Sequence, residues 1–159
     1  MNIVLTGASS GIGFEAALEF TLNSENKVVC IARSSDKLRK LLEIAKGINP
    51  DCTLLPVEFD IVNDDYAALT PFLKERLGKI DILINNAGAL INKPFLETTH
   101  ADLYEMFESN VVGHFSMIQN LIPLMGEGSH IVNIASMGGF QRSVKFPGLS
   151  GYSSSKSAL

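Results

Sequence analysis

The chain contains no tryptophan and only two cysteines, Cys30 and Cys52, among its 159 residues. Both cysteines lie in strand-like apolar runs, so the sequence predicts buried reduced thiols rather than a disulfide, and with them a cytoplasmic protein. The three histidines, His100, His114 and His130, do not have the spacing of metal ligands. We therefore expect no metal site.

The chain also has no excess of positively charged residues. The formal net charge is −4, and no cluster of lysine and arginine interrupts the sequence, which excludes a nucleic-acid-binding surface. No apolar run is long enough to cross a bilayer and no signal peptide precedes the first strand-like run, so no membrane partner is expected. Without repeats or a linker, the length predicts a single domain over residues 1–159.

Strand-like and helix-like segments alternate along the chain, a pattern typical of a parallel sheet covered on both faces. It predicts an α/β, doubly wound, Rossmann-type sheet of strand order 3-2-1-4-5 in three α/β/α layers. The expected strands are 2–6, 27–32, 53–59, 80–84 and 130–135. The first two expected helices are 14–22 and one that Ser34 or Ser35 caps and whose apolar stripe reaches Ile48. A third starts at 63 with an interruption at 70–71, and a fourth opens with a capping box at Thr99 and Asp102 and runs to about 124.

Apolar periodicity also predicts which helix faces are buried. In the first helix Ile12, Ala16 and Phe20 recur every four residues, and the second helix has a longer apolar stripe. That stripe consists of Leu38, Leu41, Leu42, Ala45 and Ile48. Pro56 in the third strand indicates a position near the edge of the sheet.

The first strand runs into a glycine-rich segment, Gly7 to Gly13, and then into a helix. Such a junction forms an anion site, because backbone N–H groups point outward and the helix dipole favours negative charge. Missing Cβ atoms let a pyrophosphate approach closely. The glycines are spaced G-x-x-x-G-x-G, not G-x-G-x-x-G, so this segment alone is equally consistent with an ordinary turn.

Polar residues or glycines follow every other strand as well. Arg33 follows the second strand, Asp60 the third, Asn85-Asn86-Ala87-Gly88 the fourth and Ser136 the fifth. Functional groups collect at the carboxyl ends of strands in such sheets. The set therefore predicts one site at that edge.

Tyr152 and Lys156 are four residues apart and share one face if their segment is helical. A free tyrosine has a pKa of about 10, which makes it a poor proton shuttle at neutral pH. A neighbouring ammonium favours the phenolate, so the pair is a candidate for general acid–base chemistry.

These motifs together resemble those of the short-chain dehydrogenase/reductase family. They occur in the family's order, and the resemblance extends from the first strand to the end of the chain. The matching residues are Thr6-Gly7-x-x-x-Gly11-x-Gly13, Asp60, Asn85-Asn86-Ala87-Gly88, Asn110, Ser136 and Tyr152-x-x-x-Lys156. The resemblance implies an NAD(P)-dependent oxidoreductase that acts on a small carbonyl/alcohol substrate and forms a homo-oligomer, a dimer or a tetramer.

The resemblance also implies roles. Tyr152 passes the proton, Lys156 holds the nicotinamide ribose and tunes the tyrosine, Ser136 binds the substrate oxygen, and Asn110 anchors a water. The implied cofactor contacts, besides Tyr152 and Lys156, are Gly7, Ser9, Ser10, Gly11, Ile12, Gly13, Arg33, Asp60, Ile61, Asn86, Ala87 and Gly88.

For two of these residues the sequence supplies reasons that do not depend on the family resemblance. Asn110 lies on an otherwise apolar helix face, where an amide is costly unless it is hydrogen-bonded, so it needs a specific partner. At the end of the second strand an acid would bind the ribose 2′-OH of NAD, whereas an arginine accommodates a 2′-phosphate. Ala32 and Arg33 occupy this place, so the sequence favours NADP, with NAD as the alternative.

Two features depart from the family pattern. Ser136 and Tyr152 are sixteen residues apart, which enlarges the loop between them, and the family continues well beyond the position of Leu159. We therefore expect an N-terminal portion of such an enzyme. The alternatives are a dinucleotide-binding fragment without turnover and, against the glycine spacing, a sugar-nucleotide epimerase or dehydratase.

Overall fold

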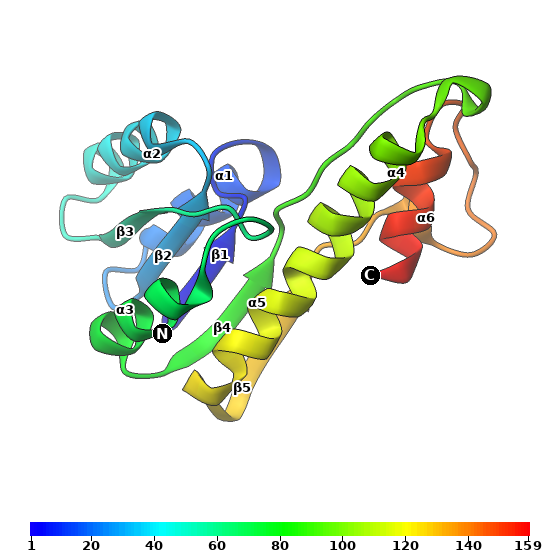
Figure 1. Cartoon of the computed structure of the whole chain (residues 1–159). Helices are drawn as coiled ribbons and strands as arrows, with labels where there is room; N and C mark the ends of the chain where they lie inside the picture. The colour runs from blue at the N-terminus through cyan, green and yellow to red at the C-terminus, as the bar shows by residue number, and fades with distance from the viewer.

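A computed structural model describes residues 1–159 and contains one five-stranded sheet, in which all the strands are parallel (Figure 1). The order β3-β2-β1-β4-β5 is the predicted 3-2-1-4-5. Pro56 lies in the outer strand β3, as expected. The strands are β1 (Asn2–Thr6), β2 (Lys27–Ala32), β3 (Thr53–Glu58), β4 (Ile80–Asn85) and β5 (Met125–Asn133).

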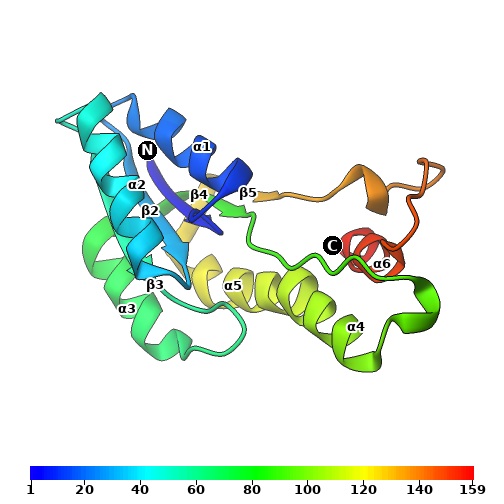
Figure 2. The same ribbon diagram turned by 90° about the horizontal axis from the view of Figure 1, so that it is seen from above.

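Helices cover both faces of the sheet. Helices α1 (Gly11–Thr21) and α2 (Ser35–Ile48) lie on one side, and α3 (Tyr66–Leu77) and α5 (Gly113–Leu121) lie on the other (Figure 2). The remaining helices, α4 (His100–Phe107) and α6 (Ser150–Ala158), lie beyond the tip of β4. No helix combines the length and the apolar character that a membrane crossing requires.

Successive side chains of the central strands pack alternately into two separate hydrophobic cores. Ile3 and Leu5 of β1 pack toward α1 and α2, whereas Val4 between them packs toward α3 and α5. This alternation follows from the two-residue repeat of a strand, and it explains why a doubly covered strand is apolar at nearly every position. Cys30 and Cys52 are buried free thiols in the first of these cores.

The predicted face of α1 is shifted by one residue. The buried positions are Gly13, Ala17 and Thr21, while Ala16 and Phe20 are only partly buried and Ile12 is 66% exposed. The shift arises because Gly13 packs directly under the preceding loop. In α2 the predicted stripe is correct except at its last residue, Ile48, which is exposed.

Helix α3 begins three residues later than predicted and is not interrupted. Asp65 caps it by accepting a hydrogen bond from the Ala67 backbone, and the helix continues through Pro71. A proline inside a helix costs about 3 kcal/mol. Burial of Leu69, Leu73 and Leu77 on one face offsets that cost and keeps the helix continuous.

Strand β5 begins at Met125, five residues before the predicted start. Met125 pairs with Ile80, and the register then shifts so that His130 pairs with Ile82. Ser129 stabilises the irregular stretch, since its hydroxyl accepts from the Gly126 backbone at 3.1 Å and donates to the Ile80 carbonyl at 2.9 Å.

The predicted helix from Thr99 consists of several segments. Thr99 and Asp102 form the expected capping box, α4 follows, and a π-helical turn over Glu108–Val112 leads into α5. A 3₁₀ turn over Ile122–Leu124 ends the run. Asn110 lies in the π turn, a type of local widening that is frequent at functional sites.

The loops that follow β1 and β4 are in close contact. A Cβ atom on Gly7, where φ is +69°, would lie 2.7 Å from the Ala87 Cα. A Cβ on Gly13 would overlap the Gly7 carbonyl oxygen and the Asn86 side-chain nitrogen. Glycine is required at both positions because nothing larger fits between the loops.

We expect Gly13→Ala to lower the free energy of unfolding by about 1–3 kcal/mol, since the new methyl group overpacks this contact. Gly47→Ala is the matched control. Gly47 lies in α2 with nothing near its Cβ position, so alanine there should raise the free energy of unfolding by about 0.5–1 kcal/mol. Urea denaturation of both variants measures the difference. Equal changes in the free energy of unfolding of the two variants would contradict the close contact between Gly13 and the loops.

Candidate active site

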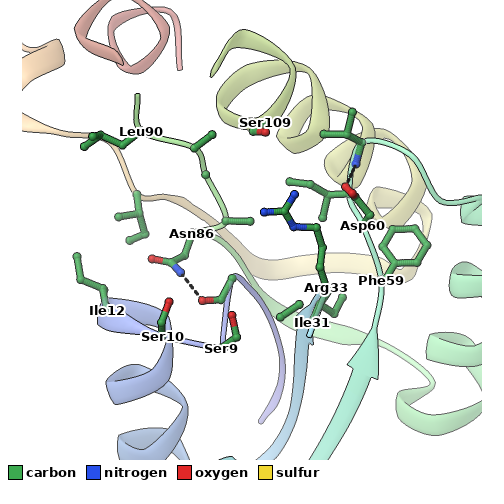
Figure 3. A pocket seen from close by; sticks show the side chains of 18 of the residues that line it. Ser9, Ser10, Ile12, Ile31, Arg33, Phe59, Asp60, Asn86, Leu90 and Ser109 are labelled. Atoms are coloured by element: carbon green, nitrogen blue, oxygen red, sulfur yellow. Dashed lines mark hydrogen bonds between the residues drawn. The ribbon is translucent and has the colours of Figure 1, made fainter. Parts of the chain in front are cut away.

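A cavity of about 470 Å³ runs along the carboxyl ends of the strands (Figure 3). Loops that follow all five strands contribute to its wall. Among the residues that the sequence singles out, those lining the cavity are Gly7, Ser9, Ser10, Ile12, Arg33, Asp60, Ile61, Asn86, Ala87, Gly88, Tyr152 and Lys156.

Four of the singled-out residues lie outside this lining. Gly11 opens α1 with φ at +56°, and Gly13 packs beneath the loop. Asn110 is fully buried behind the wall. Ser136 lies next to the lining residue Ala135, at the start of the enlarged loop. Gly13 and Asn110 thus support the site from behind, Gly11 is exposed at the start of α1, and Ser136 borders the cavity.

Several other lining residues were not predicted. Lys37 and Ser109 add polar groups. The other eight are apolar: Ile31, Ala32, Phe59, Val62, Ala89, Leu90, Ile134 and Ala135. Lys37 lies at the start of α2, four residues after Arg33. A search for cations in the first turn after the second strand would have found it.

The N-terminus of α1 faces this cavity without a side-chain cap. Ser10 is the N-cap residue, but its side chain accepts no hydrogen bond from the helix, and the first turn carries no acidic residue. The helices α2, α3 and α4 are each capped by a side chain, from Ser34, Asp65 and Thr99 respectively. The free N–H groups of α1 are therefore available to an anion.

Charged groups gather at the end of the cavity near β2. The Arg33 guanidinium points between Asn86 and Asp60 (Figure 3), and Lys37 lines the same wall. Burial acts to raise the pKa of Asp60, but hydrogen bonds from Val62 and Asn63 and the nearby Arg33 outweigh it, and the pKa is lowered. Asp60 is thus ionised at neutral pH and holds its own loop in shape.

The segment Asn86–Ala89 is held by side chains from other elements. The Asn86 amide donates to the backbone carbonyls of Thr6 and Gly7, at 3.0 and 3.2 Å. The Thr6 hydroxyl accepts from the backbone N–H groups of Asn86 and Ala87. These four bonds fix the position of the loop after β4 relative to the glycine loop.

Asn110 has the specific partners that its buried position demands. Its side chain binds both backbone groups of Ala89 at 2.9 Å and donates to the Ser155 hydroxyl at 2.8 Å. Ser155 is buried in α6 and donates in turn to the Tyr152 carbonyl. Asn110 therefore connects the π turn, the loop after β4 and α6, and sequence reasoning missed its partner Ser155.

Tyr152 and Lys156 lie in helix α6, so the condition under which they share one face is met, and both line the cavity. Lys156 is buried, donates to the Ile134 carbonyl at 2.8 Å and has its pKa lowered by burial. Its Nζ atom is also close to Gly88, since a Cβ there would lie 3.6 Å away. The Ser136 hydroxyl accepts from the Gly138 backbone and keeps its own proton free to donate.

Known proteins are similar to this chain in sequence and in fold. The sequence model of the short chain dehydrogenases matches residues 1–159. The ketoacyl reductase HetN of Nostoc sp. is 34% identical, over 99% of this chain and 54% of its own length. The NADPH-dependent 1-acyldihydroxyacetone phosphate reductase of Saccharomyces cerevisiae is 34% identical, over 98% of this chain and 51% of its own length.

A solved structure of a dehydrogenase is also similar to this chain. It is a 7α-hydroxysteroid dehydrogenase in complex with NADH and 7-oxo glycochenodeoxycholic acid, 30% identical, with a TM-score of 0.85 over 99% of this chain and 60% of its own. The chain spans about half the length of the curated relatives described above. Since the family match extends over every residue, the chain belongs to the short-chain dehydrogenase family.

Proposed function

We propose that this chain binds a nicotinamide dinucleotide, with NADP favoured, and forms the cofactor half of an oxidoreductase acting on a carbonyl/alcohol pair. The observation that carries the proposal is the single cavity that joins the uncapped start of α1, the Arg33–Lys37 cations and the Tyr152–Lys156 pair. Relatives named as reductases and as a dehydrogenase support this class of reaction.

The residues present fit the cofactor. The free N–H groups of α1 suit the pyrophosphate, and the glycines at 7 and 13 let the glycine loop pack closely against the loop after β4. Arg33 and Lys37 suit a 2′-phosphate, and Ala32 presents no carboxylate that would repel it. When bound, the nicotinamide supplies or accepts the hydride.

The remaining chemistry belongs to side chains near the other end of the cavity. We assign Tyr152 as the proton donor to a carbonyl oxygen and Ser136 as the hydrogen-bond donor that polarises that oxygen. Lys156 places a cation beside Gly88 and one helical turn from Tyr152, and we assign it to bind the nicotinamide ribose. Asn110, through Ser155, holds the helix that carries both.

An inert dinucleotide-binding unit is the second candidate. The two curated relatives carry roughly as many further residues as this chain contains. Under this alternative, residues 1–159 bind the cofactor without turning over a carbonyl substrate.

The cofactor preference can be tested at Arg33. We expect Arg33→Asp to weaken NADPH binding by about 1.5–3 kcal/mol, or about 10- to 150-fold in Kd, because a charge-assisted bond to the 2′-phosphate is lost. NADH binding should change little or improve. Titration of the reduced cofactor's fluorescence measures both.

Arg39→Asp is the matched control, since Arg39 is exposed on α2, pairs with Asp36 and does not line the cavity. It makes the same change in net charge and should leave both affinities within about twofold. Equal losses of NADPH and NADH affinity in Arg33→Asp would show that Arg33 acts on the fold and not on the phosphate.

The proton-transfer role can be tested at Tyr152. In the active enzyme, Tyr152→Phe removes only the phenolic oxygen, so we expect kcat to fall roughly 10²- to 10⁴-fold while NADPH affinity is retained. Tyr104→Phe is the control, because Tyr104 is exposed on α4, outside the cavity lining. Oxidation of NADPH by a panel of ketones measures turnover. Parent-level turnover by Tyr152→Phe would end this assignment.

A further inference from the structure

His114 is fully buried in α5 and contacts the wall of the cavity from behind. Its Nε2 atom lies 2.6 Å from the Ala87 carbonyl oxygen. Its other ring nitrogen, Nδ1, is buried without a hydrogen-bond partner. The other two histidines, His100 and His130, are exposed. The roles assigned above do not use His114.

The partner of Nε2 determines the protonation state of the ring. A carbonyl oxygen can only accept, so Nε2 must carry the proton and Nδ1 must be the bare nitrogen. A second proton on Nδ1 would place an unpaired charge in the core, on the side of the molecule where the Lys156 ammonium already lies. Burial lowers the pKa of His114 to about 4; the hydrogen bond to Ala87 acts to raise it and Lys156 to lower it, so the ring is neutral at pH 7.

The Ala87 backbone is thereby bound from two sides. Its N–H donates to the Thr6 hydroxyl at the end of β1, and its carbonyl accepts from His114 on α5. Its Cα packs against Gly7, with no room for a Cβ between them. A displacement of Ala87 would therefore move the wall of the cavity at Ala87 and Gly88 relative to the glycine loop.

We propose that His114 is a positioning residue for cofactor binding: its neutral imidazole donates Nε2–H to the Ala87 carbonyl and holds the loop after β4 against the glycine loop. The inference rests on the proposed dinucleotide site. It assigns to His114 an effect on affinity through Ala87 and no contact with the cofactor.

Substitution tests the effect on affinity. We expect His114→Leu, which retains an apolar side chain but no donor, to weaken NADPH binding by about 3- to 30-fold, because a buried carbonyl loses its partner. His114→Gln places an amide nitrogen where Nε2 lies and should stay within about threefold of the parent. His100→Leu removes an exposed histidine and should have no effect. Cofactor fluorescence titration on folded protein, checked by circular dichroism, gives the affinities.

Nuclear magnetic resonance of the ring nitrogens tests the contact in the unmodified protein, even where a variant fails to fold. His114 should show a protonated Nε2 and a bare Nδ1, unchanged from pH 8 to pH 5.5. A His114 ring that gains a second proton between pH 8 and pH 5.5, or that carries its single proton on Nδ1, would overturn the inference.

The outcomes separate the two proposals. A parent protein that binds neither NADPH nor NADH overturns the proposed function, and the inference with it. A parent that binds, together with a folded His114→Leu of unchanged affinity or a His114→Gln as weak as His114→Leu, overturns the inference alone.

Discussion

The contact between the loops after β1 and β4 is the constraint on which the site depends. Asn86 and Thr6 bridge the two loops with hydrogen bonds, and the glycines at 7 and 13 allow the backbones to approach. The two strands are neighbours in the sheet, and both loops leave its carboxyl edge. Because the cavity wall consists of these two loops over much of its length, their separation sets its shape.

Helices α4 and α5 reinforce this contact from outside the sheet. The π turn brings Asn110 to Ala89, and one helical turn later His114 reaches Ala87. Through Ser155 the same π turn is also tied to α6, where Tyr152 and Lys156 lie. The buried polar groups of this region are therefore joined across elements that are far apart in sequence, and each bond satisfies a group that would be costly to bury alone.

The cationic side chains at the end of the cavity near β2 contribute to the site in a different way. Arg33 and Lys37 are exposed, and their effect on a ligand is electrostatic rather than steric. Their position follows from local structure alone, because both lie at the junction of β2 and α2. Neither side chain takes part in the hydrogen bonds that join the loops after β1 and β4.

The sequence by itself determined the order and type of the elements up to β5, the family and just over half of the cavity lining. Alternating apolar runs, the capping box at Thr99 and the polar residues after each strand are local signals, and a parallel sheet brings the ends of its strands to one edge. These signals did not fix the boundaries of α3 and β5, where the burial of Leu69, Leu73 and Leu77 and a register shift beside Ile80 prevailed.

Only the tertiary structure decided which buried polar groups meet. His114 lacks the spacing of a metal ligand, and the sequence gives no reason to place it beside Ala87, which is 27 residues away. Ser155 is one of three consecutive serines, and only its burial opposite Asn110 separates it from the exposed Ser154. The physical reason is that hydrogen bonds between distant segments depend on how helices pack on the sheet, and the pattern of a single segment does not contain that information.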